Sequence, residues 1–201
     1  MKKIIKSLYP FVIACLIANS VIGQNINHRS KNKPNIVLIL ADDLGYGDLQ
    51  CYGTGKIPTP NCDKMADEGL MFTDVHSPSA VCSPTRYGIL TGNYAWRTWL
   101  KNWIVKEHMP LLIDEKTLTI QQYLKFKGYT TGCIGKWHLG WGNGIYPDWN
   151  GELKPGPLET GFDYYYGVPY SHNSPSHLQV YVENRRIVGL NDGENIYDKK
   201  V

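Results

Sequence analysis

Residues 35–41 form a strand-length apolar stretch that reads Asn-Ile-Val-Leu-Ile-Leu-Ala and ends at two adjacent aspartates. Its aliphatic residues follow one another without polar alternation, and several are β-branched. This pattern predicts a strand buried on both faces, as in a parallel sheet. Two further stretches, residues 70–76 and 129–134, also predict strands.

Helical patterns separate these predicted strands. The pattern predicts helices over residues 61–68, 86–92 and 117–127, which end at or just before Gly69, Gly92 and Gly128. Alternating strands and helices predict an α/β domain with a mostly parallel sheet flanked by helices. From about residue 141 the pattern changes to glycine, proline and aromatic residues, so we expect the sheet to be incomplete at its C-terminal side.

The first 23 residues have the features of a secretory signal peptide. They combine a basic start, an apolar run over residues 10–18 and small residues up to Gly23, after which we expect cleavage. The apolar run is too short for a membrane span. We therefore expect export to the periplasm or beyond, with residues 24–34 as a flexible lead-in and 35–201 as the folded part.

The leader allows two other interpretations. Residues 12–15 (Val-Ile-Ala-Cys) resemble a lipoprotein cleavage box, in which Cys15 would carry a lipid anchor. Alternatively, the leader is a structural N-terminal helix.

Composition and charge narrow the class of protein. An apolar share of 42% and a charged share of 19% can build a core, which excludes a disordered chain and a polytopic membrane protein. The formal charge of +3 comes from the leader lysines Lys2, Lys3 and Lys6, so the mature chain is neutral. A neutral chain gives no electrostatic reason to bind nucleic acid or an anionic membrane.

The cysteines leave several interpretations open. Cys51, Cys62, Cys82 and Cys133 remain after the leader, and in an oxidising compartment they could form two disulfides. Their spacing lacks the paired cysteines typical of zinc sites. Cys82 is a buried thiol, half of a disulfide or a nucleophile activated by Arg86 one helical turn later.

Polar residues follow two of the predicted strands. Asp42 and Asp43 follow the first, and Lys136 and His138 follow the strand over 129–134. Adjacent carboxylates suit a hard cation such as calcium or magnesium, or else form a solvated turn that caps a helix. Ligands of α/β sheets bind at the carboxyl ends of strands, so both pairs are candidates for one crevice.

The pentapeptide Cys82-Ser-Pro-Thr-Arg86 resembles the signature of the type I sulfatases. Residues 35–48, 59–72 and 132–140 (GCIGKWHLG) are similar to further family segments, and the resemblance covers residues 34–172. It implies an alkaline phosphatase-like fold and a sulfuric-ester hydrolase. It also implies that a dedicated maturation enzyme oxidises Cys82 to formylglycine.

The resemblance also implies roles for the site residues. Hydrated formylglycine would attack the sulfur of a sulfate ester with one hydroxyl, and its second hydroxyl would allow release of the sulfate. Asp42, Asp43 and position 82 would hold the calcium or magnesium ion. Arg86 would orient the hydrate and Lys136 would bind sulfate charge. His138 would be the base of the release step.

A third match, residues 161–163 and 167–172, resembles the arylsulfatase A branch. It implies that Ser171 lines the substrate pocket, although a turn would also explain this serine. The remaining metal ligands of the family, a second lysine and a later histidine have no counterpart here. We therefore expect the N-terminal part of a sulfatase catalytic domain, inactive by itself.

Two other functions stay open. One is a formylglycine-dependent phosphodiesterase or phosphonate hydrolase, because phosphate and sulfate esters share their shape. The other is a non-catalytic remnant that only binds anions or sugars and keeps the Cys82 thiol. Within the sulfatase interpretation the substrate is a sulfated small molecule or glycan, either an aryl or a carbohydrate sulfate.

Overall fold

The computed structural model describes residues 33–53, 55–171 and 179–198. The signal peptide, Cys15 and residues 24–32 of the lead-in lie outside this part. The chain divides into two compact units, residues 1–44 and 45–201, which are described separately. Among the described residues, no helix is long and apolar enough to cross a membrane.

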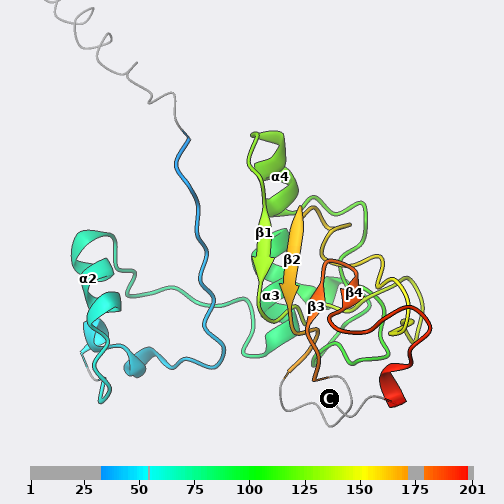
Figure 1. Cartoon of the computed structure of the whole chain (residues 1–201). Helices are drawn as coiled ribbons and strands as arrows, with labels where there is room; N and C mark the ends of the chain where they lie inside the picture. The colour runs from blue at the N-terminus through cyan, green and yellow to red at the C-terminus, as the bar shows by residue number, and fades with distance from the viewer. Residues whose placement is uncertain (1–32, 54, 172–178, 199–201) are drawn as a thin grey trace, which may run out of the picture. The chain divides into compact units, whose positions relative to one another are not determined.

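In the first unit, the strand predicted over residues 35–41 does not form. These residues are exposed and belong to no strand, and Figure 1 draws them as a thin coil. Val37 and Ile39, for example, are 80% and 79% exposed. A strand is stabilised by its ladder partners and by cover on its faces, and no described strand pairs with this stretch.

The second unit begins with two single-turn 3-10 helices, η2 (Tyr46–Asp48) and η3 (Gln50–Tyr52), followed by α2 (Pro60–Glu68). Proline at the first position of α2 agrees with its missing N–H and fixed φ. The strand predicted over residues 70–76 is also wrong. This segment is exposed coil, because no described strand offers it a ladder.

Helix α3 (Cys82–Thr91) begins four residues before the predicted start. Pro84 lies in its first turn, where a backbone N–H has no intrahelical partner, so proline does not interrupt the helix. The helix ends at Gly92, which has a left-handed backbone (φ 67°). Cys82 is therefore the first residue of the helix.

Helix α4 (Ile120–Phe126) is shorter than predicted. Thr119 is its N-cap, and its hydroxyl accepts a hydrogen bond from the N–H of Gln122 while the Gln122 amide oxygen accepts one from the Thr119 N–H. This reciprocal capping box starts the helix three residues later than expected. The short 3-10 helices η4 (Ala95–Arg97) and η5 (Ile196–Asp198) complete the helical elements of the described residues.

The sheet contains four strands in the order β1-β2-β3-β4 (Figure 1). Strands β1 (Gly132–Ile134) and β2 (Tyr164–Gly167) are parallel, whereas β2 and β3 (Val182–Glu183) and β3 and β4 (Arg186–Ile187) are antiparallel. The α/β class is confirmed, but the described sheet is mixed rather than mostly parallel. Only two residues connect β3 to β4, and such a connection forces a hairpin.

The core of the second unit is rich in aromatic residues. Trp137, Trp141 and Tyr165 are almost fully buried and pack with ring centroids 5.6 to 6.4 Å apart. Trp137 comes from the segment after β1, and Tyr165 lies on β2. This packing fixes the position of the segment that carries Lys136 and His138.

The segment after β1 also continues the sheet pairing. The N–H groups of Gly135, Trp137 and His138 donate to the carbonyls of Tyr166, Val168 and Pro169, at 2.9, 3.0 and 2.9 Å. A side chain at Gly167 would place its Cβ 1.8 Å from the Gly135 carbonyl oxygen. Gly167 therefore allows the two backbones to approach.

We expect Gly167→Ala to lower the free energy of unfolding by about 3 kcal/mol, because the Cβ must displace rigid backbone next to Lys136. Urea denaturation of the purified protein measures this change. Gly144→Ala is the matched control, since a Cβ at Gly144 meets nothing within 4 Å and should change stability by less than about 1 kcal/mol. Equal stability of the two variants would contradict the close approach.

Candidate functional site

Cys82 and Lys136 meet where α3 begins and β1 has just ended. The Lys136 ammonium nitrogen Nζ lies 3.1 Å from Sγ of Cys82. These residues are 54 positions apart in the sequence, and both were predicted site residues. The contact places a positive charge on position 82, which is also the positive end of the helix dipole.

Arg86 lies one helical turn after Cys82 and reaches the same segment. Its Nη1 donates to the main-chain carbonyl of Lys136 at 2.5 Å. The sequence predicted that Arg86 would orient the group at position 82. In the structure Arg86 holds the backbone of the lysine that contacts this position.

Cys133 on β1 is close to Arg86 as well. Burial raises the pKa of the Cys133 thiol from its ordinary value of 9.0 to about 11, and the positive charge of Arg86 opposes this rise. Burial likewise raises the pKa of the neighbouring Tyr165. Cys133 is therefore a neutral thiol that covers the Arg86 side chain.

The raised pKa of Cys133 has a consequence for stability. The folded protein keeps this proton longer than the unfolded chain, so the contribution is present below about pH 9 and is lost as the pH rises through 11. Between these values the wild type should lose about 2 kcal/mol more unfolding free energy than Cys133→Ala. Urea titrations at several pH values measure the difference. The exposed Cys62→Ala is the control, and parallel pH curves for wild type and Cys133→Ala would contradict the buried thiol.

His138 is buried beside the same helix, with 2% of its surface exposed. Its Nε2 lies 3.1 Å from the carbonyl oxygen of Val105, and its ring packs edge-on against Tyr170 at 5.6 Å. Its backbone is left-handed (φ 56°), which is uncommon for a residue other than glycine. Such strain is often found at functional sites and is held in place by surrounding structure.

Ser171 directly follows Tyr170, the ring that packs against His138, and is half-buried. It stands at the edge of the described part of the chain, because residues 172–178 lie outside it. Its predicted role in the substrate pocket stays a prediction.

Asp42 and Asp43 belong to the first unit. Both are exposed at a bend, and Asp43 has a left-handed backbone (φ 58°). Within the described ranges, no three His, Cys, Asp or Glu side chains gather into a metal site. The predicted metal role of the two aspartates is therefore neither supported nor tested here.

No disulfide joins Cys51, Cys62, Cys82 and Cys133 in the described structure. The two expected disulfides do not form among these residues, which are dispersed over η3, α2, α3 and β1. The chemistry of Cys82 is thus not that of half a disulfide.

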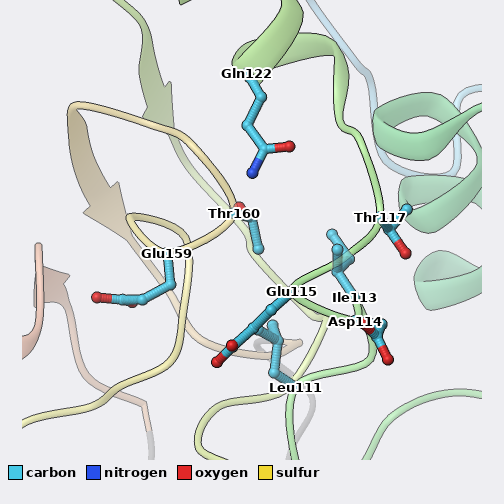
Figure 2. Close-up of a pocket in the computed structure, with 8 residues that line it drawn as sticks. All are labelled: Leu111, Ile113, Asp114, Glu115, Thr117, Gln122, Glu159 and Thr160. Atoms are coloured by element: carbon cyan, nitrogen blue, oxygen red, sulfur yellow. The ribbon is translucent and has the colours of Figure 1, made fainter.

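A small hollow lies elsewhere in the second unit, between the segment before α4 and the loop before β2 (Figure 2). Its carboxylates come from Asp114, Glu115 and Glu159, which Figure 2 shows pointing in different directions. Glu159 already pairs with Arg185 at 2.7 Å. The hollow therefore lacks converging cation ligands, and none of the predicted site residues lines it.

Comparison with known proteins agrees with this site. The family model described as Sulfatase matches residues 34–201. The chain belongs to the sulfatase family. The match includes Cys82, Arg86, Lys136 and His138, which the structure places around the start of α3.

Named relatives have the same assignment. The chain is 41% identical to N-acetylgalactosamine-6-O-sulfatase of Bacteroides thetaiotaomicron over 89% of its length, and 41% identical to human arylsulfatase G over 83%. These matches cover only 35% and 28% of the relatives. The chain thus spans about a third of their length.

Solved structures support the fold. A structure from work on glycosaminoglycan metabolism by Bacteroides thetaiotaomicron matches 80% of the chain with a TM-score of 0.74 and 43% identity, and 33% of that protein is covered. The Ps i-CgsB crystal structure matches 78% of the chain at 28% identity with a TM-score of 0.65, over 37% of its own length. The predicted alkaline phosphatase-like sulfatase fold is confirmed for the region covered.

Sequence reasoning missed two contributors to the site. Val105 contacts His138 through its main chain, and Ser83 contacts Val105 through its hydroxyl. A main-chain contact leaves no signature in residue type, so Val105 could not be found. Ser83 lies inside the recognised pentapeptide, but only the fold shows what its hydroxyl contacts.

Proposed function

We propose that the chain is the N-terminal part of an exported enzyme that hydrolyses sulfate monoesters through a formylglycine made from Cys82. The observation that carries this proposal is the 3.1 Å contact between the Lys136 ammonium and the side chain of residue 82. A cation at a helix N-terminus provides the charge that a sulfate ester and its attacking oxygen require. Family membership supports the reaction class.

The residues around position 82 fit a formylglycine. The Lys136 ammonium is a strong donor already directed at the side-chain atom of residue 82, so it would donate equally to an oxygen in place of the sulfur. Hydrated formylglycine supplies one hydroxyl that attacks sulfur and a second one through which sulfate is later released. This modification requires a formylglycine-generating maturation enzyme as a partner.

A divalent cation, calcium or magnesium, completes the proposal. Asp42 and Asp43 supply the carboxylate oxygens that such ions prefer, so the donor chemistry fits. The ion would polarise a sulfate oxygen and favour loss of a proton from the attacking hydroxyl.

The chain's own residues then have distinct tasks. Lys136 binds the negative charge of the sulfate group, and Arg86 keeps the Lys136 backbone in place through its 2.5 Å hydrogen bond. His138 accepts a proton during sulfate release. Ser171 contacts the organic part of the substrate.

The substrate class that we propose is a sulfated carbohydrate, with aryl sulfates as convenient model substrates. One relative acts on an N-acetylgalactosamine-6-sulfate group by its name, and Ps i-CgsB was crystallised with a neocarrahexaose. Both relatives have a carbohydrate ligand, which supports the proposal for this chain.

The full-length gene product, produced together with a formylglycine-generating enzyme, tests the proposed function. We expect hydrolysis of 4-methylumbelliferyl sulfate and of N-acetylgalactosamine-6-sulfate, loss of activity with EDTA, and recovery with calcium or magnesium. Faster hydrolysis of an aryl phosphodiester than of the aryl sulfate would favour the phosphodiesterase alternative. Absence of turnover on all substrates by aldehyde-containing protein would favour the remnant.

A further inference from the structure

The contact between His138 and Val105 determines which ring nitrogen carries hydrogen. The Val105 carbonyl oxygen can only accept a hydrogen bond, and it lies 3.1 Å from Nε2 of His138. Nε2 must therefore carry the hydrogen whether the ring is neutral or charged. Any proton that His138 takes up or gives back then moves at Nδ1.

Val105 is itself fixed by the helix that begins at Cys82. The Val105 N–H donates to the hydroxyl oxygen of Ser83 at 3.0 Å. Both Ser83 and Val105 are fully buried, with 0% of their surface exposed. Water therefore cannot replace either partner, and the hydrogen bond depends on the Ser83 hydroxyl.

These contacts form a continuous connection from residue 82 to His138. Ser83 is the neighbour of Cys82 in the first turn of α3, its hydroxyl holds the N–H of Val105, and the carbonyl of the same residue holds His138. The connection spans three segments that are distant in the sequence. It sets the distance and the tautomer of the histidine relative to the start of α3.

We propose that Ser83 is a positioning residue that, through the main chain of Val105, holds His138 with hydrogen on Nε2 and leaves Nδ1 as the nitrogen that exchanges a proton. This inference deepens the proposed function and rests on it. The Ser83 hydroxyl touches neither substrate nor the reacting atoms, and it acts only through Val105 and His138.

The position of His138 in the cycle makes the proposal specific. His138 serves the release of sulfate, whereas expulsion of the alcohol precedes that step. A misplaced His138 therefore slows the second half of the cycle and leaves the first half intact. The expected signature of Ser83→Ala is a full initial burst of alcohol, followed by slow turnover.

The test compares Ser83→Ala, Ser83→Thr and wild type as full-length, matured protein with 4-methylumbelliferyl sulfate. Peptide mass gives the aldehyde content, so all rates are expressed per aldehyde. We expect Ser83→Ala to give a burst of about one product per aldehyde and a steady rate at least about tenfold lower. Ser83→Thr keeps a hydroxyl and should recover to within about threefold of the wild type.

Thr91→Val is the matched control for loss of a hydroxyl from the same helix. The Thr91 hydroxyl donates within α3 to the Tyr87 carbonyl at 2.7 Å and does not reach Val105. Its steady rate per aldehyde should equal that of the wild type. A steady rate in Ser83→Ala equal to the control, or a burst that falls in proportion to the steady rate, would overturn the positioning role.

Nitrogen-15 NMR of histidine-labelled protein reads the tautomer without any turnover, with His138→Gln to assign the signal. Wild type should show hydrogen on Nε2 and a lone pair on Nδ1, and Ser83→Ala should show a mixture of tautomers. A wild-type signal with hydrogen only on Nδ1 would refute the proposal even if the enzyme is active. Failure of wild type to hydrolyse sulfate esters refutes the proposed function instead, while the tautomer can still be read.

Discussion

Cys82→Ala should abolish sulfate-ester hydrolysis by the full-length, matured protein, with kcat at least about 10⁴-fold below that of the wild type. The substitution removes the side chain from which the nucleophile is made, and no neighbouring group can replace it. Steady-state hydrolysis of 4-methylumbelliferyl sulfate measures the loss. Helix α3 should persist, because alanine is a good helix former at its first position.

The matched control for this experiment is Cys62→Ala. Cys62 is an exposed thiol on α2 and takes no part in the contacts around position 82. Its activity should stay within about twofold of the wild type. Substantial activity in Cys82→Ala would show that the reaction does not pass through residue 82.

Lys136→Met should lower kcat/KM for aryl sulfates by about 10² to 10³-fold. Methionine keeps most of the length of the side chain but removes the ammonium that lies 3.1 Å from position 82. The lost charge acts on the sulfate group and on the attacking oxygen, so the effect should appear in kcat as well as in KM. Initial rates over a range of substrate concentrations separate the two.

Lys64→Met controls for the loss of a surface charge. Lys64 lies on α2 and pairs at 3.8 Å with Glu68, and both side chains are 69% exposed. Such a pair contributes little, so activity and stability should hardly change. Equal activity of Lys136→Met and Lys64→Met would contradict a role of Lys136 in binding sulfate.

The sequence predicted the site better than the strands. Cys82, Arg86, Lys136 and His138 were found from motif spacing, and the fold brings all four to the start of α3. Motif residues are constrained by chemistry, so their types and spacing carry the information directly.

The strands depend on neighbours instead of on local pattern alone. Residues 35–41 have an ideal pattern for a buried strand, yet they remain exposed because no described strand pairs with them. By contrast, β2 was not predicted, although three successive tyrosines suit a strand, and it forms because β1 lies beside it. Pairing partners are a tertiary property that one segment cannot reveal.

Helix boundaries shifted for local reasons that are visible in hindsight. Helix α3 starts at Cys82 because Pro84 is accepted in a first turn, and α4 starts after the Thr119 cap. The contacts of Val105 lay beyond any sequence argument, since they use its main chain alone.

The most direct test of the central claim is the mass of the peptide that contains residue 82, taken from full-length protein produced together with the maturation enzyme. The account predicts a peptide that is lighter by the difference between cysteine and formylglycine, or its aldehyde adduct after labelling with a hydrazide. A peptide with the mass of the unmodified Cys82 thiol, in a preparation where the same enzyme converts a control peptide, would contradict it.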